Sequence, residues 1–340
     1  MFATIPTAPK IYRSVSVARR FNVHGVDVEL AGAWNMLDPF IDAWLRPFAV
    51  PHDGVEASRI PVTGTLRKYD QREVVRHLSP KAVRLADAGL TELYQEGERF
   101  WLVDDRWGMC ELNLLKSSWR TWLLPNPTLD PVRCAEMALM WPMAQLLRGR
   151  GLTLLPAVSV ERDGRGVLIL SPMGIEAELT ALIRSGYRII GQRWSCVREK
   201  GAAAELLHLP GLVESARVPQ LDLSDEWVDL EGEFCGSSQA SARCDSVVIV
   251  QPARRQAVNA RELAQLEAQD ALRRGWPMVE LHRSRRQILA KLASSCRCLG
   301  VQLSRRADDL VDVLQSEPAR TDNPFAIASR RFVNATVRAA

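Results

Sequence analysis

The segment GVLILSPMGIEAELTALIRSG (residues 166–186) decides the fold that the sequence predicts. An apolar run predicts a short buried strand, Gly174 marks a turn, and apolar residues at helical spacing predict a helix that ends at Gly186. LTLLPAVSV (152–160) predicts a strand before this unit, and YRIIGQRWSCV (187–197) predicts one after it. Strand, helix and strand in this order predict a parallel pair joined by a crossover helix.

The sequence before this unit is richer in strand signals. Residues 21–30 alternate as a strand does, and residues 99–115 predict a hairpin around DDRWG. Apolar spacing predicts a helix over 34–48. A longer helix begins after Asp130, which caps it, and Pro142 inside its apolar pattern predicts a kink.

The sequence after residue 198 predicts a loop-rich stretch (199–244) that contains the acidic run SDEWVDLEGEF. A buried strand follows at 245–253. Asn259 is expected to cap a helix, with Glu262 in the capping-box position. A further helix over 277–295, a strand over 296–304 and a helix over 307–316 complete the pattern.

These elements predict a mixed α/β (α+β) fold in two parts. We expect a flexible arm over residues 1–20, a β-rich and Trp-rich domain over 21–128, an α/β domain over 129–316, and a flexible basic tail over 317–340.

Composition narrows the function classes. The chain has 340 residues with a net charge of +4, which is too weak to predict nucleic-acid binding. The seven cysteines show no C-x-x-C spacing and the five histidines are scattered, so we expect free thiols and no metal or cofactor. No 18-residue apolar run and no apolar leader occur, so we expect a cytoplasmic protein without a membrane span.

Ten tryptophans are many for this length. Core packing is the default explanation for a tryptophan. A surface that contacts a partner is the alternative, because tryptophan is enriched at binding hot spots. The candidates for such a surface are Trp34, Trp44, Trp119 and Trp122.

Residues 151–197 resemble the nucleotide-binding segment of the HPr kinase/phosphorylase family, with its P-loop of the PEP carboxykinase type, and in particular the HPr-kinase-related proteins of bacterial biosynthetic clusters. The likeness is carried by the order of strand, hydrophilic turn, GVLIL, Gly-containing turn, helix and strand. It extends in weaker form over residues 20–316. The resemblance implies a P-loop, a kinase-like fold and a site for ATP and magnesium.

The departures from that family fall on the residues that would do the chemistry. The Gly-Lys pair of the loop falls in a gap between Ile175 and Glu176, and Glu176 stands where Ser or Thr would hold magnesium. Glu176 and Glu178 place negative charge in the first turn of the helix, where a phosphate would bind. The positions of the degenerate site are Pro156 for the strand histidine, Ser171 for the first loop glycine, Gly174, which keeps the second, Glu176, and Gln192 and Arg193 for the acidic pair.

We therefore expect a pseudokinase that binds no cofactor and acts as an accessory protein for a protein or peptide partner, with oligomer formation left open. Two alternatives remain at this point. One is a divergent kinase or transferase that uses Arg193 and neighbours such as Arg165. The other is an unrelated α/β binding module in which the P-loop likeness is accidental.

Overall fold

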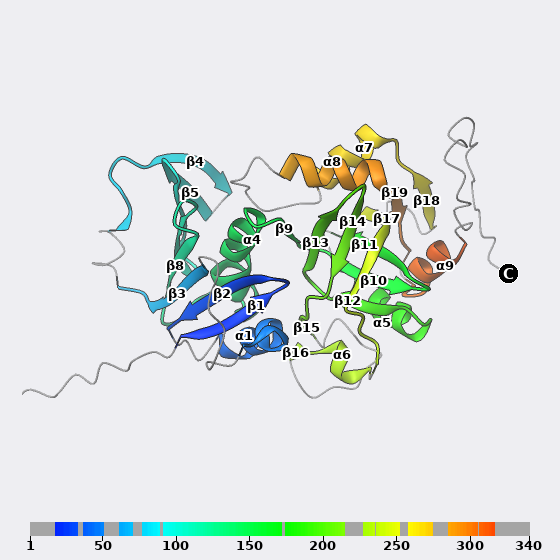
Figure 1. Cartoon of the computed structure of the whole chain (residues 1–340), viewed down its shortest axis with the longest axis horizontal. Helices are drawn as coiled ribbons and strands as arrows, with labels where there is room; N and C mark the ends of the chain where they lie inside the picture. Colours follow the sequence, from blue (N-terminus) through cyan, green and yellow to red (C-terminus); the bar gives the residue numbers. More distant parts are fainter. Residues whose placement is uncertain are drawn as a thin grey trace, which may run out of the picture.

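The computed structural model describes residues 18–32, 37–50, 61–70, 77–88, 91–171, 174–214, 227–234, 236–251, 258–274, 285–304 and 306–316. Two mixed sheets form its framework, and the segment containing α4 lies between them (Figure 1). The α/β (α+β) class expected from the sequence is confirmed.

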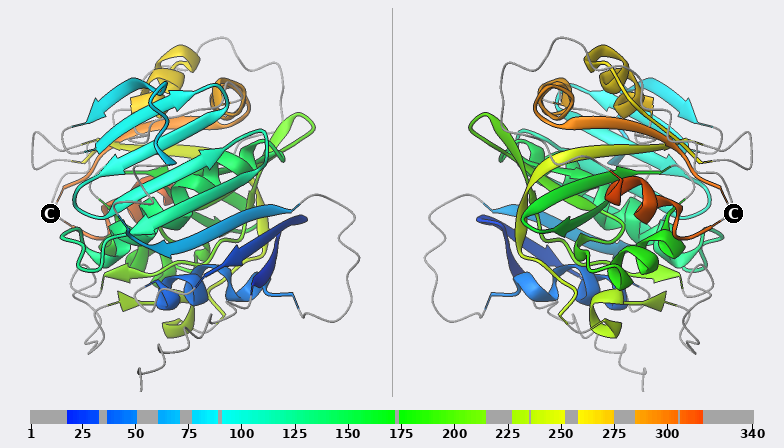
Figure 2. Two further views of the ribbon diagram at one scale, coloured as in Figure 1. Left: turned by 90° about the vertical axis from the view of Figure 1, so that its left-hand side faces the viewer. Right: turned by 90° about the vertical axis from the view of Figure 1, so that its right-hand side faces the viewer.

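The first sheet contains eight strands in the order β1-β2-β3-β8-β7-β6-β5-β4. Strands β5 to β8 form an antiparallel meander, and β3 joins it parallel to β8. Figure 2 shows this sheet with β1 and β4 at opposite edges. Its strands are β1 (Arg19–Val23), β2 (Val26–Ala31), β3 (Val62–Lys68), β4 (Val83–Ala88), β5 (Thr91–Glu96), β6 (Arg99–Asp104), β7 (Gly108–Asn113) and β8 (Ser118–Leu123).

Three predictions for this part have different outcomes. The hairpin around DDRWG is confirmed, because Asp104 pairs with Gly108 across the β6–β7 turn. The single strand over 21–30 is wrong. The chain turns at His24 and Gly25, both with positive φ, so this stretch forms the β1–β2 hairpin. The predicted helix over 34–48 is present as α1 (Asp38–Leu45) followed by a 3₁₀ turn, η1 (Arg46–Phe48).

The helix predicted after Asp130 consists of α3 (Pro131–Ala135), a π-helical segment η2 (Glu136–Met140) and α4 (Trp141–Arg148). The carboxylate of Asp130 accepts the backbone N–H of Arg133 as a helix cap, as predicted. Pro142 has no N–H to donate to the carbonyl of Ala138, and its ring would crowd that carbonyl in a regular α-helix. The π turns immediately before Pro142 widen the helix at this point.

The sheet supplies the hydrogen bond that Pro142 cannot make. The hydroxyl of Thr121, fully buried on β8, donates to the Ala138 carbonyl at 3.0 Å. Because a buried carbonyl without a donor is costly, this bond fixes the helix on the inner face of the first sheet.

The second sheet is buried on both faces. Val167 and Ile169 of β11 (Arg165–Leu170) pack with α5 (Glu176–Arg184) and α9 (Asp309–Gln315). Leu168 and Leu170, which alternate with them, pack with α7 (Gln265–Arg274) and α8 (Arg285–Ser295). An uninterrupted apolar run is what such a doubly covered strand requires.

The strand order of the second sheet corrects the predicted parallel pair. Strand β10 lies between β11 and β12, antiparallel to both, and β11 pairs in parallel with β17. The predicted strand over 152–160 is two strands, and so is the one over 187–197. The sheet order is β12-β10-β11-β17-β14-β13-β9, with β19 on β17 and β18 on β19. The bounds are β9 (Leu152–Leu155), β10 (Val158–Arg162), β12 (Arg188–Gly191), β13 (Ser195–Lys200), β14 (Ala203–Leu207), β17 (Ser241–Gln251), β18 (Asn259–Glu262) and β19 (Arg297–Gln302).

The stretch 199–244, predicted to be loop-rich, contains short elements: β14, the two-stranded sheet of β15 (Val213–Glu214) and β16 (Trp227–Val228), and α6 (Leu230–Glu233). The predicted helix cap at Asn259 is wrong. Asn259 caps no helix, because Asn259–Glu262 pairs with β19 as β18, and Glu262 binds Arg297 instead.

The predicted division into domains at residue 128 remains a prediction. Residues from both sides of it, among them Trp44, Leu102, Leu139 and Leu154, belong to one core cluster. Arg19 and Arg20 of the predicted arm belong to β1, and the predicted tail lies outside the described residues. Within the described part of the chain, no helix is long and apolar enough to cross a membrane.

Replacing Thr121 by valine keeps the shape of the side chain and removes the donor to Ala138. We expect Thr121→Val to lower the free energy of unfolding by about 1–2 kcal/mol, measured by guanidinium denaturation. Pro142→Ala returns an N–H four residues after Ala138, so the double variant should regain a substantial part of this loss. A double variant less stable than either single one would contradict this account of the helix.

Candidate functional site

The candidate site lies where β11 ends and α5 begins. The hydroxyl of Ser171, the first residue after β11, donates to the carbonyl of Gly174 at 3.0 Å. Ile175 is the N-cap residue of α5, and no side chain caps the helix. Pro172 and Met173 lie outside the described residues. The strand and the helix predicted here are therefore confirmed, with Gly174 between them.

The carboxylate of Glu176 lies against Gly174. Gly174 has a φ of +79°, and a Cβ atom at this position would collide with the Glu176 carboxylate oxygens. Glu178 lies two residues after Glu176, in the first turn of α5. Burial raises the pKa of Glu178, and the negative charges of Glu176 and Asp309 raise it further. The helix N-terminus, which in a P-loop faces phosphate, here carries the acidic side chains of Glu176 and Glu178.

Arg193 is held by an ion pair inside the protein. It lies in the β12–β13 connection, and its Nε donates to Oε1 of Glu136 at 2.5 Å. The other oxygen of Glu136 accepts from Arg133 at 3.0 Å. Burial opposes the charge on Arg193, but the Glu136 carboxylate beside it prevails and raises the pKa of Arg193. Arg193 is therefore a charged residue with an anionic partner in the protein.

Gln192 has a structural role as well. It is 2% exposed, its amide donates to Asp229 Oδ1 at 2.9 Å, and its carbonyl oxygen accepts the N–H of Leu230 at 3.2 Å. Asp229 also caps α6 by accepting the N–H of Glu231. Gln192, which stands at one position of the expected acidic pair, thus holds Asp229 and Leu230 of the acidic run SDEWVDLEGEF in place.

The sequence did not predict that His208 joins this cluster. Its Nε2 lies 2.8 Å from Oε2 of Glu231, and its backbone carbonyl is 2.6 Å from Nε2 of His24 in the β1–β2 turn. Burial lowers the pKa of His24. The hydrogen bonds from His24 to His208 and from His208 to Glu231 connect the first sheet to α6.

Pro156 lies in the bend between β9 and β10. The family likeness places a strand histidine here. Proline has neither a titratable group nor an N–H, so this position supplies no general base.

Three of the four tryptophans considered for a partner surface follow the default explanation, core packing, and do not form such a surface. Trp44, Trp119 and Trp122 are 1%, 4% and 0% exposed and belong to buried apolar clusters. Trp34 lies outside the described residues.

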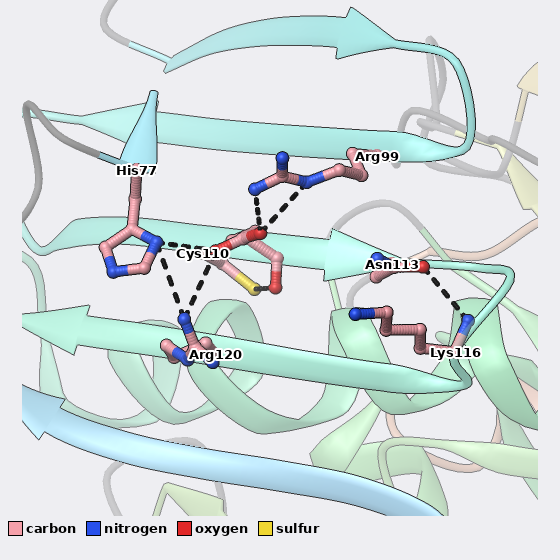
Figure 3. A network of polar contacts seen from close by, with 7 residues as sticks. His77, Arg99, Cys110, Asn113, Lys116 and Arg120 are labelled. Atoms are coloured by element: carbon pink, nitrogen blue, oxygen red, sulfur yellow. Dashed lines mark hydrogen bonds and ion pairs between the residues drawn. The ribbon is translucent and has the colours of Figure 1, made fainter. Parts of the chain in front are cut away.

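A second polar network lies on the face of the first sheet that turns away from α4 (Figure 3). Glu111 of β7 is the central acid. Oε1 of Glu111 accepts from Arg99 at 2.7 Å, and Oε2 lies 3.3 Å from Nδ1 of His77 and 3.8 Å from Arg120. The guanidinium groups of Arg99 and Arg120 offset the burial of the carboxylate. Among the described residues, neither this network nor the candidate site brings together three side chains able to hold a metal ion.

Comparison with known proteins gives little further information. No family model and no curated protein matches the chain. A solved structure that does match is the HPr(Ser) kinase/phosphatase from Coxiella burnetii, with 13% sequence identity, 47% of this chain and 91% of that chain covered, and a TM-score of 0.27. This likeness is too low to support an argument about fold or activity.

The ion pair at the site can be tested by stability. Arg193→Ala leaves Glu136 with its partly exposed partner Arg133 only, and we expect a loss of about 3 kcal/mol in the free energy of unfolding. Arg133→Ala removes the more exposed cation from the same carboxylate and should cost less than about 1 kcal/mol. Similar small losses for both variants in denaturant titrations would contradict a structural role for Arg193.

Proposed function

We propose that this protein is a non-catalytic accessory protein that binds a protein or peptide partner. The observation that carries the proposal is the arrangement of charge at the end of β11. The Glu176 carboxylate lies against the turn that would receive a phosphate, and the nearby Arg193 is paired with Glu136.

Phosphoryl transfer depends on positioning and charge, namely a cation for the transferred group and carboxylates for magnesium. The chain offers the opposite charge at the helix N-terminus. Gln192 and Arg193 stand where the acidic pair is expected, and both have partners within the protein. This arrangement supports the proposal that the protein keeps the strand, turn and helix but lacks the residues needed for phosphoryl transfer.

A nucleotide titration tests the non-catalytic part of the proposal. We expect isothermal titration with ATP or ADP and magnesium to show no saturable binding in the micromolar range, because carboxylates at the loop repel phosphate. We also expect no label transfer from γ-labelled ATP to co-purified protein. Saturable binding that Arg193→Ala abolishes would instead support a divergent transferase.

The surface that favours a partner is the edge strand β4. No described strand pairs with its outer side, whereas β1, at the other edge, is bridged by Ala49. Val83 and Leu85 of β4 are 64% and 49% exposed. An open edge strand with exposed aliphatic side chains is a template for an added strand, so we propose that an extended segment of the partner pairs with β4.

Substitution on β4 should separate partner binding from folding. For a partner isolated with the wild-type protein, we expect Val83→Glu together with Leu85→Glu to weaken binding at least tenfold, measured by titration calorimetry. Leu115→Glu is the matched control, since Leu115 is 83% exposed in the turn after β7. Equal affinities for the wild type and the β4 variant would exclude this surface.

A further inference from the structure

Two cysteine side chains meet where β17 and β19 begin to pair. Cys244 lies in β17, two residues before Ser246, which is opposite Arg297 of β19. Cys296 lies between α8 and β19, directly before Arg297. The Sγ of Cys296 donates to the backbone carbonyl of Cys244 at 3.2 Å, and both side chains belong to the same buried core cluster.

We propose that Cys244 and Cys296 are an oxidation-sensitive site, and that they form a disulfide when the folded protein meets a hydroperoxide.

The surroundings give the two thiols different roles. The neighbouring Cys244 thiol lowers the pKa of Cys296 despite its burial, and Ser295 contributes in the same direction. The neighbouring Cys296 thiol, together with burial, raises the pKa of Cys244. Because the thiolate is the nucleophile, Cys296 reacts first and Cys244 resolves the product.

The reaction is balanced without a further reagent. The Cys296 thiolate attacks the outer oxygen of the hydroperoxide, the O–O bond breaks, and an alcohol (water, from hydrogen peroxide) leaves with a sulfenic acid on Cys296. The Cys244 sulfur then attacks Cys296 and displaces hydroxide, which takes the Cys244 proton and leaves as water. The two thiols lose two electrons and the peroxide gains them.

The hydrogen bond from Cys296 Sγ to the Cys244 carbonyl, at 3.2 Å, places the two residues side by side where β17 and β19 begin to pair. A disulfide spans Cα atoms about 4.4–6.8 Å apart, a separation typical of residues on neighbouring strands. The bond would join residues 52 positions apart in sequence, at the start of an existing strand pair. It should therefore raise the midpoint of thermal unfolding by several degrees without rearranging the sheet.

Other described thiols provide internal controls. Burial raises the pKa of Cys110 and of Cys196 to about 12. Cys298 is two residues from Cys296, and burial raises its pKa to about 12 as well. These three thiols should react with peroxide more slowly than Cys296.

Peptide mapping tests the proposal directly, because Arg297 separates Cys296 from Cys298. The full chain is treated with hydrogen peroxide under native conditions, alkylated with N-ethylmaleimide and digested with trypsin. Mass spectrometry should then detect CDSVVIVQPAR joined to LASSCR as the main disulfide product. Reduction with dithiothreitol should abolish this species.

Variants identify the reacting pair. Cys244→Ser and Cys296→Ser should abolish the linked species, whereas Cys298→Ser and Cys196→Ser should retain it, with folding checked by circular dichroism. The mapping of the wild type does not depend on the variants. No linked species from folded protein, or a main product that joins Cys298, Cys235 or any other pair, would overturn the proposal.

Discussion

Pro142 removes one N–H from the middle of the helical segment that runs between the two sheets. The segment cannot stay a regular α-helix there, so it widens into π turns over Glu136–Met140. Thr121 of the first sheet then donates to the Ala138 carbonyl that Pro142 leaves without its α-helical donor. The Thr121 hydroxyl thus takes the place of the missing N–H donor, and this hydrogen bond holds the helical segment against the first sheet.

The same segment determines the character of the candidate site. Glu136 is the first residue of the widened turns, and its carboxylate accepts a hydrogen bond from Arg193, which lies between two strands of the second sheet. The pair joins the helix to the β12–β13 connection inside the protein, where an unpaired charge would be costly. Arg193 balances the charge of the buried Glu136 carboxylate and so stabilises the fold. Its charge is then not available to balance that of a phosphate.

Local patterns in the sequence predicted those elements that depend on neighbours in the chain. The strand, turn and helix over 166–186 were predicted because glycines bound an apolar run, and the hairpin around DDRWG because its strands are adjacent. Strand β18 was missed because its pairing partner β19 lies about forty residues later, so local sequence resembled a helix cap at Asn259.

The site was predicted less completely for the same reason. Glu176 at the helix N-terminus could be recognised from its position, but the bond between Glu136 and Arg193 joins residues 57 positions apart. One signal was available in the sequence. Glu136 is a charged residue within the apolar run VRCAEMALMW, and such a residue needs a partner when the run is buried. The partner itself could only be found in three dimensions.

A double-mutant cycle on Glu136 and Arg193 distinguishes charges that stabilise the fold from charges that bind a ligand. The cycle compares Glu136→Gln, Arg193→Ala and the double variant by denaturant unfolding, with and without magnesium and ATP. We expect a coupling energy of about 2–3 kcal/mol that nucleotide does not change. A coupling energy near zero, or stabilisation of the wild type by nucleotide that is lost in Arg193→Ala, would contradict this expectation.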